Sequence, residues 1–140
     1  MKRSDGFSLV EVMVVLTILG ILIAIAVTRY TRAIEQSRAA IAAANLRAIW
    51  SAERLYWLEH RAYTADLPSL QALGLLDPAI VMTTSGYVYS LRAAAENTCT
   101  AAATRTGSNA WTGEFVIDET GAFSGSVSAP GEPNIVPGFQ

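Results

Sequence analysis

The sequence has very little of the chemistry that builds covalent cross-links or metal centres. Its 140 residues include one cysteine, Cys99, and one histidine, His60. A single cysteine excludes a disulfide within the chain, so we expect Cys99 to be a small buried apolar residue with a free thiol. No thiols, imidazoles or acids stand at ligand spacing, so the sequence predicts no metal site, no cofactor and no catalytic residue. We expect three acids that could be considered as calcium ligands to be solvated turn residues instead: Asp118, Glu119 and Glu132.

Charge is scarce as well. Charged residues make up 16% of the sequence, and the formal net charge is −2. The basic residues form no run beyond Lys2-Arg3, and Arg92 and Arg105, on predicted strands, are too few for a basic patch. Proteins that bind nucleic acid carry a basic surface for the phosphates, so we expect no nucleic-acid partner.

Proline and glycine are absent between Thr28 and His60. Alanine, arginine, glutamate and leucine dominate this stretch, and all of them favour helix. Apolar residues recur every seven positions at Ile34, Ile41, Ala48 and Leu55, which predicts one apolar stripe along the helix. Neighbours of the stripe at three- and four-residue steps are Ile49, Ala52 and Tyr56. The charged residues fall mostly elsewhere, on a side that we expect to be solvated: Arg32, Glu35, Arg38, Arg47 and Glu53.

What the sequence does contain is a long hydrophobic run near its start. Residues 7–27 are almost entirely apolar and carry one acid, Glu11. As a helix, this run would be about 31 Å long, which matches the hydrocarbon core of a bilayer. A carboxylate in such a segment costs roughly 2.5–3.5 kcal/mol on insertion scales, so it needs a partner and a purpose. Lys2 and Arg3 precede the run, and the positive-inside rule places that end in the cytoplasm.

This N-terminal region has three possible interpretations. A secretory signal peptide fits the basic start, the apolar core and the small residues Ala24 and Ala26. Cleavage near Ala26 would then release an exported soluble binding domain. A plain single-pass anchor fits the length of the run. Neither interpretation explains Glu11, and the helical pattern continues past Val27, where a signal peptide would become extended.

The third interpretation rests on a resemblance. Gly6-Phe7-Ser8-Leu9-Val10-Glu11 resembles the processing motif of type IV prepilins and type II secretion pseudopilins. In that family a membrane aspartyl peptidase cuts after the glycine and methylates the new amino group. The resemblance therefore implies cleavage between Gly6 and Phe7 and N-methylation of Phe7. The family's glutamate is the fifth residue of the mature chain, which is the position of Glu11. Gly20 and Tyr30 fall where the family commonly has glycine and tyrosine, and they are implied helix-packing positions.

The chemistry of this motif also follows from its residues. Glycine lets a protease groove hold the backbone closely at Gly6. The first turn of a helix exposes unpaired N–H groups and a partial positive charge, which favour an acid such as Glu11. In a bundle of such helices, the free amine of Phe7 in one subunit can meet Glu11 of the next. Both charges then leave the lipid as a pair, and the resemblance gives Glu11 this role in assembly.

The resemblance implies a structural subunit of a type IV pilus-like filament and no enzyme; a pseudopilin of a type II secretion system is the alternative. The implied partners are further copies of the chain in a helical homopolymer, prepilin peptidase, an inner-membrane assembly platform and the membrane itself. We expect one pass through the inner membrane with the head outside the cytoplasm, followed by entry into a pilus or a periplasmic pseudopilus. The family usually has proline where this chain has Thr28, so we expect a straighter helix there.

The remaining residues predict an α+β, pilin-like fold in which a long helix packs on a small antiparallel sheet. A long helix from about Phe7 to Glu59 should be followed by a short one between Asp66 and Gly74, with Leu67, Leu70 and Leu73 toward the core. Strand patterns cover 87–91, 98–104, 114–118 and 122–125, and the tail at 129–140 should be irregular. We divide the chain into a leader (1–6), a transmembrane half-helix (7–28), an amphipathic half-helix (29–60) and a head (61–140).

Overall fold

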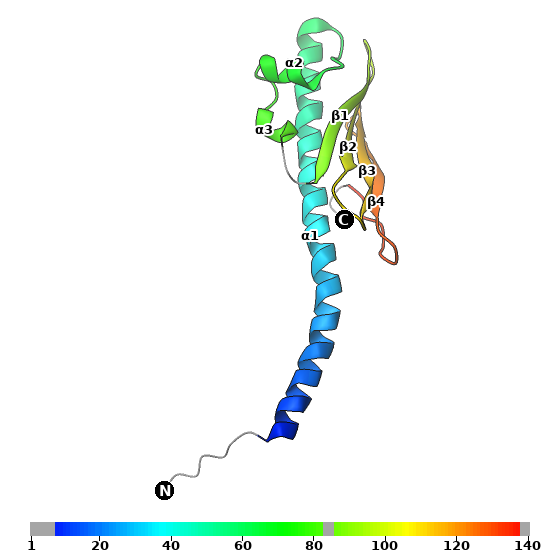
Figure 1. Ribbon diagram of the computed structural model, residues 1–140. Helices are drawn as coiled ribbons and strands as arrows, with labels where there is room; N and C mark the ends of the chain where they lie inside the picture. Colours follow the sequence, from blue (N-terminus) through cyan, green and yellow to red (C-terminus); the bar gives the residue numbers. More distant parts are fainter. Residues whose placement is uncertain (1–7, 83–85, 138–140) are drawn as a thin grey trace. The chain divides into compact units, whose positions relative to one another are not determined.

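A computed structural model describes residues 8–82 and 86–137, and it confirms an α+β chain. The chain divides into two compact units, Met1–Glu35 and Gln36–Gln140. Helix α1 (Leu9–His60) supplies the regular structure of the first unit and enters the second (Figure 1). Its boundaries lie close to the predicted ones, and Phe7, the predicted start, falls outside the described residues.

Helix α1 is long because nothing in its sequence interrupts it. It runs without a break through Thr28, where proline would have removed a backbone hydrogen bond. It ends at His60 because Arg61 takes a left-handed conformation with φ 57°. The Arg61 amide still donates to the Trp57 carbonyl at 2.8 Å, so the last turn closes before the chain leaves the helix.

Two short helices follow, each with an aspartate cap and a proline in the first turn. Helix α2 (Leu67–Ala72) begins after Asp66, whose carboxylate accepts from the Ser69 amide at 3.2 Å. Helix α3 (Pro78–Val81) begins after Asp77, whose carboxylate accepts from the Ala79 amide at 2.8 Å. The prediction of α2 is confirmed, whereas α3 was missed, although an aspartate directly before a proline is an ordinary helix-start signal.

One detail of the α2 prediction is wrong. Leu67 and Leu70 are buried as expected, but the Leu73 side chain is 53% exposed. Leu73 is the C-terminal cap of α2, and Gly74 follows with φ 70°. The left-handed turn at Gly74 carries the chain away from the helix, so the three-residue spacing that placed Leu73 in the core does not apply.

The sheet is a four-stranded antiparallel meander in the order β1-β2-β3-β4. Its strands are β1 (Tyr87–Ala94), β2 (Cys99–Arg105), β3 (Thr112–Asp118) and β4 (Phe123–Ser128). All four predicted strands are present, although most run further than the sequence pattern indicated. In Figure 1, the sheet lies on one side of the upper part of α1, and α2 and α3 lie on the other.

The core lies where α1 meets the sheet, and much of it is built from small side chains. Strand β2 turns Cys99, Ala101 and Ala103 inward, and each is at most 3% exposed. Helix α1 meets them with alanines of its own, together with larger residues from the other strands. Small side chains on both surfaces let helix and sheet approach closely at native packing density. The largest fully buried apolar side chains of this core are Phe115, Leu46, Ile49, Leu70, Ile117 and Val127.

The predicted apolar stripe of the helix is only partly right. Ile49 and Ala52 are buried as expected, but Ile41 and Leu55 are 45% and 51% exposed, and Ile34 and Ala48 are only half-buried. The buried face continues with Ala39, Ala42 and Leu46. The helix thus has two apolar faces. The face rich in alanine packs on the sheet, with Leu46 and Ile49 in the core, and the face with Ile41 and Leu55 is left outside.

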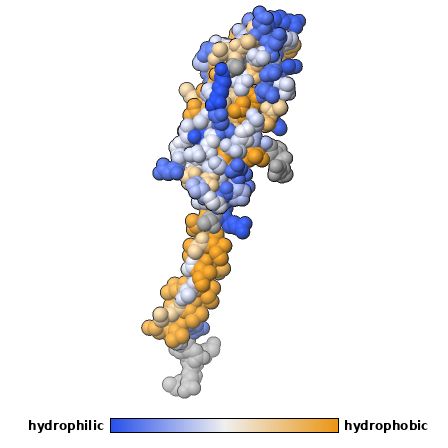
Figure 2. Space-filling model, turned by 90° about the vertical axis from the view of Figure 1, so that its right-hand side faces the viewer, coloured by the Kyte–Doolittle hydropathy of each residue, from blue (hydrophilic) through white to orange (hydrophobic). Residues whose placement is uncertain are grey.

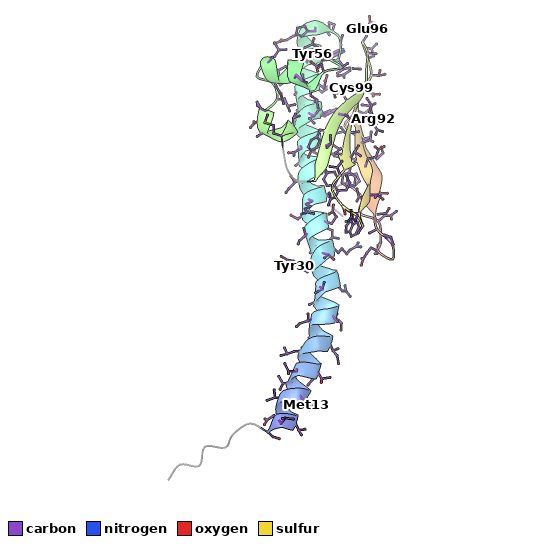
Figure 3. All side chains as sticks on the ribbon, viewed as in Figure 1. Met13, Tyr30, Tyr56, Arg92, Glu96 and Cys99 are labelled. Carbon is purple, nitrogen blue, oxygen red and sulfur yellow. The ribbon has the colours of Figure 1, made fainter. Side chains whose placement is uncertain are left out.

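Two tryptophans fasten α1 to the hairpin turns of the sheet. The Trp50 indole N–H donates to the Glu119 carbonyl at 3.1 Å, in the β3–β4 turn. The Trp57 indole N–H donates to the Glu96 carbonyl at 2.8 Å, in the β1–β2 turn, which Figure 3 shows at the end of the sheet. Both turns lie at the same end of an antiparallel meander, so two residues seven apart on one helix can reach both.

The assignment of the buried face of α1 can be tested with two matched substitutions. Ile49→Ala should lower the free energy of unfolding of the detergent-solubilised chain by about 2–5 kcal/mol, because it leaves a cavity in the core. Ile41→Ala removes the same atoms from an exposed site and should change it by less than about 0.5 kcal/mol. Urea unfolding followed by tryptophan fluorescence measures both. A larger loss for Ile41→Ala would contradict the assignment of the buried face.

Candidate functional site

The first candidate site is the apolar part of α1. Every side chain described between residues 9 and 27 is exposed, including Leu9 at 75%. Among the described residues, α1 is the one helix long and apolar enough to cross a membrane, and no part of its apolar window is buried. Figure 2 shows this segment as an almost continuous hydrophobic surface. Apolar area of this extent in water would drive association, so the segment requires lipid or other protein around it.

Glu11 interrupts this surface in the first turn of α1. Its side chain is exposed, and the carboxylate has no hydrogen bond or ion pair to any residue in 8–82 or 86–137. The other polar side chain of the segment behaves differently, because the Thr17 hydroxyl donates to the Met13 carbonyl of the same helix at 2.8 Å. Thr17 can therefore enter lipid satisfied, whereas Glu11 needs a cation from outside the described residues.

The other residues predicted for this site are Gly6, Phe7, Gly20 and Tyr30. Gly6 and Phe7 lie outside the described residues, so the cleavage site stays a prediction. Gly20 faces open space, since a Cβ added there would meet nothing within 4 Å. Tyr30 is 68% exposed and points away from the helix (Figure 3). No contact with the described part of the chain requires glycine or tyrosine at these positions, which leaves both available for packing against another helix.

The two head arginines that the sequence analysis considered are already engaged. Arg92 lies at the bulge of β1, and both of its terminal nitrogens donate to the Glu114 carboxylate on the outer face of the sheet. Arg105 is 8% exposed; it donates to the Gly86 carbonyl at 2.9 Å and lies over the Tyr87 ring. These contacts hold strands together, and neither arginine contributes to a basic patch.

The acids of the β3–β4 turn serve the turn itself. The Asp118 carboxylate accepts from the Thr120 amide at 2.9 Å and from the Ala122 amide at 3.0 Å. Hydrogen bonds from the Thr120 hydroxyl and from these amides hold the pKa of Asp118 below its usual range. Across residues 8–82 and 86–137, no three histidine, cysteine or acidic side chains gather closely enough to hold a metal ion.

Two buried acids, Glu35 and Glu53, were not anticipated: both were expected on a solvated side of the helix, and Glu35 is 2% exposed. Glu53 was placed on a solvated face, but it is 0% exposed, because it lies four residues after Ile49 on the buried side of α1. Its Oε2 accepts from the Thr64 amide at 3.1 Å, and its Oε1 has no partner among the described residues. Burial raises the pKa of Glu53 to about 7. The phase of Leu46, Ile49 and Glu53, at steps of three and four, is the signal that could have revealed it.

Cys99 lies in the same region of the core and is free, as predicted. Burial raises the pKa of its thiol to about 12, and the nearby charges of Glu53 and Glu119 add to the effect. Thiol chemistry depends on the thiolate, so this cysteine is inert at neutral pH.

Comparison with known proteins places the N-terminal segment. The family defined by the prokaryotic N-terminal methylation motif matches residues 1–27. The chain combines this motif with a pilin-like α+β fold. It is 36% identical over 72 residues to type II secretion system core protein G of Pseudomonas aeruginosa, which is 51% of each chain. It is also 36% identical over 62 residues to type IV major pilin protein PilA of Myxococcus xanthus, 44% of this chain and 28% of that one.

A third relative covers more of the pilin-like chain at lower identity. The type IV wide pilus major component PilA4 of Thermus thermophilus is 24% identical over 111 residues, 79% of this chain and 81% of its own. The match spans about half the length of the secretion protein and less than a third of the Myxococcus pilin. Type IV pilins and a secretion core protein thus both appear among its homologues.

The buried carboxyl generates a prediction about pH. Free glutamate has a pKa of 4.5, against about 7 for Glu53 in the folded chain. Between these values the unfolded chain releases the proton and the folded chain keeps it, so the free energy of unfolding falls as the pH rises through this window. The loss approaches about 3 kcal/mol above pH 7.

Glu53→Gln should remove this component, so the variant gains stability over the wild type when the pH is raised from about 5 to about 8. Chemical unfolding of the detergent-solubilised chain at both pH values measures the gain. Glu59→Gln, an exposed acid on the same helix, serves as the control and should keep the wild-type pH dependence. An equal difference between wild type and Glu53→Gln at both pH values would contradict the raised pKa.

Proposed function

We propose that this chain is the structural subunit of a type IV pilus-like filament and does not act as an enzyme. It is made as a membrane precursor, cut between Gly6 and Phe7, methylated on the Phe7 amine and polymerised through its N-terminal helix. One observation carries the proposal: within the methylation motif, an acid that has no partner among residues 8–82 and 86–137 lies in the first turn of an exposed apolar helix.

The free energy needed to place that acid in lipid supports the proposal. Glu11 in lipid costs roughly 2.5–3.5 kcal/mol, and removing water from an isolated carboxylate gains nothing in return. Cleavage before Phe7 creates an amine four residues before the acid in sequence. The amine of one copy can neutralise Glu11 of another, so both charges become tolerable only when copies stack. Such a pair makes assembly favourable and defines how far each helix advances along the next.

The second unit offers a further surface to sister copies. Ile41, Leu55 and Leu58 are 45%, 51% and 62% exposed on the outer face of α1. Side chains of this size gain roughly 1.5–3 kcal/mol each when they are fully buried. A filament core of parallel helices would cover them, which explains why these three large apolar residues lie outside the core of the head.

The same proposal assigns parts, partners and location. Residues 1–6 are the leader, 7–28 the transmembrane and assembly segment, 29–60 the amphipathic half of the helix and 61–140 the head. Processing requires prepilin peptidase, and extraction from the membrane requires an inner-membrane assembly platform. The head lies outside the cytoplasm before assembly, because Lys2 and Arg3 retain the other end inside.

A pseudopilin of a type II secretion system is the second candidate, favoured by the 36% identity to a secretion core protein. A pilus subunit and a pseudopilin share the processing and the helix packing, and they differ in where the filament ends. Deleting the chain removes surface filaments in the first case and stops the export of folded proteins in the second. Immunogold labelling of intact cells and an assay of secreted proteins separate the two.

Processing can be tested on the mature protein. Mass spectrometry of the N-terminal peptide should find N-methylated Phe7 as the first residue. Gly6→Val should block cleavage, because a β-branched side chain prevents close approach of the peptidase groove. Gly20→Ala should leave cleavage unchanged, since a Cβ there meets nothing within 4 Å. A mature chain that starts after Ala26 would instead identify a signal peptide and end the filament proposal.

Assembly can be tested at the acid. Glu11→Leu should leave membrane insertion intact or improve it, by about 2.5–3.5 kcal/mol on insertion scales, and lower filament yield at least about ten-fold. Thr17→Val is the matched control, because Thr17 is satisfied within its own helix and should assemble normally. Sheared filaments quantified against membrane-bound subunit give the yield. Wild-type yield from Glu11→Leu would contradict the role given to this acid.

A further inference from the structure

Three arginines recur every seven residues in the sequence: Arg47 and Arg54 lie on α1, and Arg61 directly follows its last residue. All three are exposed, and no residue in the described part of the chain forms an ion pair with any of them. Because residues seven apart lie on nearly the same side of a helix, Arg47 and Arg54 share one side of α1 about 10.5 Å apart. Arg61 continues this series at the end of the helix. We call these three residues the arginine ladder.

Each arginine of the ladder is positioned by an aromatic ring. The Arg47 Cζ lies 5.2 Å from the centre of the Phe123 ring, at the start of β4. The Arg54 Cζ lies 5.8 Å from the centre of the Trp50 ring. The Arg61 Cζ lies 5.2 Å from the centre of the Trp57 ring. A guanidinium on an aromatic face keeps its donors available at the rim, so these side chains can bind carboxylates while stacked.

The rings are themselves held in place. Trp50 and Trp57 donate their indole N–H groups to turn carbonyls of the sheet. The ladder is therefore preorganised, and binding a partner costs less side-chain entropy than it would for arginines in free solution. Arg92 and Arg105 differ, because their donors are used within the head. Unused positive charge is thus concentrated along one flank of α1, where the helix borders the hairpin turns.

The opposite side of α1 carries complementary charge. Helices α2 and α3 lie there, across α1 from the sheet (Figure 1). Their caps, Asp66 and Asp77, are both exposed. Each uses one carboxylate oxygen in capping, Oδ2 of Asp66 and Oδ1 of Asp77. The second oxygen of each has no partner among residues 8–82 and 86–137, so it can accept from an arginine.

We propose that the arginine ladder of one copy docks on the α2–α3 face of a second copy, with Arg54 and Arg61 directed to Asp66 and Asp77. The contact joins two different surfaces of the same chain. Such a head-to-tail contact leaves one free surface of each kind on the pair, so copies can be added without closing a ring. The inference rests on the proposed filament function and names the head surfaces that would meet in it.

A double-mutant cycle on the full-length chain tests the contact. Arg54→Gln with Arg61→Gln removes charge from the ladder. Asp66→Asn with Asp77→Asn removes charge from the other surface and keeps both helix caps, since asparagine caps as well as aspartate. Each pair should lower the yield of sheared filaments about ten-fold and reduce the sensitivity of assembly to salt. The quadruple variant should be no worse than either pair, because one contact is lost only once.

Matched controls separate this contact from folding and from net charge. Arg54→Lys with Arg61→Lys keeps the positive charge and should retain more yield than the glutamine pair. Glu59→Gln removes an exposed acid from α1, outside the α2–α3 face, and should assemble as wild type. Circular dichroism and thermal unfolding in detergent confirm that every variant has a folded head.

The outcomes are distinct. Losses that multiply in the quadruple variant would show two unrelated contacts and overturn the inference. Wild-type yield from the ladder pair would also overturn it, and would leave the proposed function standing provided Glu11→Leu fails in the same assay. A ladder pair that assembles normally but no longer retains an anionic polymer, with heparin as the probe, would assign the ladder to such a polymer and equally overturn the inference. If the unmodified chain forms no filament, the inference and the proposed function both fall.

Discussion

A single carboxylate, Glu11, in an exposed apolar helix is the constraint on which the rest depends. Its neighbours cannot satisfy it, because they are hydrocarbon and the one other polar group of the segment bonds to its own helix. Lipid cannot satisfy it either. The acid is tolerable only beside a cation supplied from elsewhere, and a new amine at the end of a sister helix is such a cation. In the proposed filament, processing, membrane insertion and polymerisation would therefore all serve to neutralise this one charge.

The division of apolar side chains on α1 follows from a second demand. The helix packs on its own sheet and, in the proposed filament, on other helices. The sheet side uses small residues such as Ala42 and Ala101, so the backbones come close and two tryptophans reach the turns. The outer side keeps Ile41, Leu55 and Leu58. Larger residues in place of these alanines would push the helix away from the sheet and break the indole hydrogen bonds.

These two faces also explain which parts of the fold could be predicted from the sequence. Local signals worked where chemistry is local: Asp66 before Leu67-Pro68 marked α2, and the alternation around Phe115 marked β3. The spacing of Gly6, Phe7 and Glu11 pointed to the methylation motif that the comparison confirms. The buried face of α1 could not be identified from the sequence, because both apolar faces have the same helical period. The prediction was based on the face with Ile41 and Leu55, which is the exposed one. Glu53 was assigned to solvent for the same reason. It is a charged residue, and its position on the buried face could be recognised only after that face had been identified correctly.

The proposed contacts differ in what each can specify. The two helical residues of the arginine ladder, Arg47 and Arg54, lie about 10.5 Å apart, so the ladder alone would tolerate a slip by that distance at the loss of one exposed ion pair, worth about 0.2–1 kcal/mol. Glu11 has no neighbouring acid to replace it, and a slipped copy would leave it unpaired in lipid at roughly 2.5–3.5 kcal/mol. The buried pair therefore fixes the axial register and the exposed pairs fix which faces of the heads meet. High salt should loosen the second arrangement long before it affects the first, because screening acts on exposed charges.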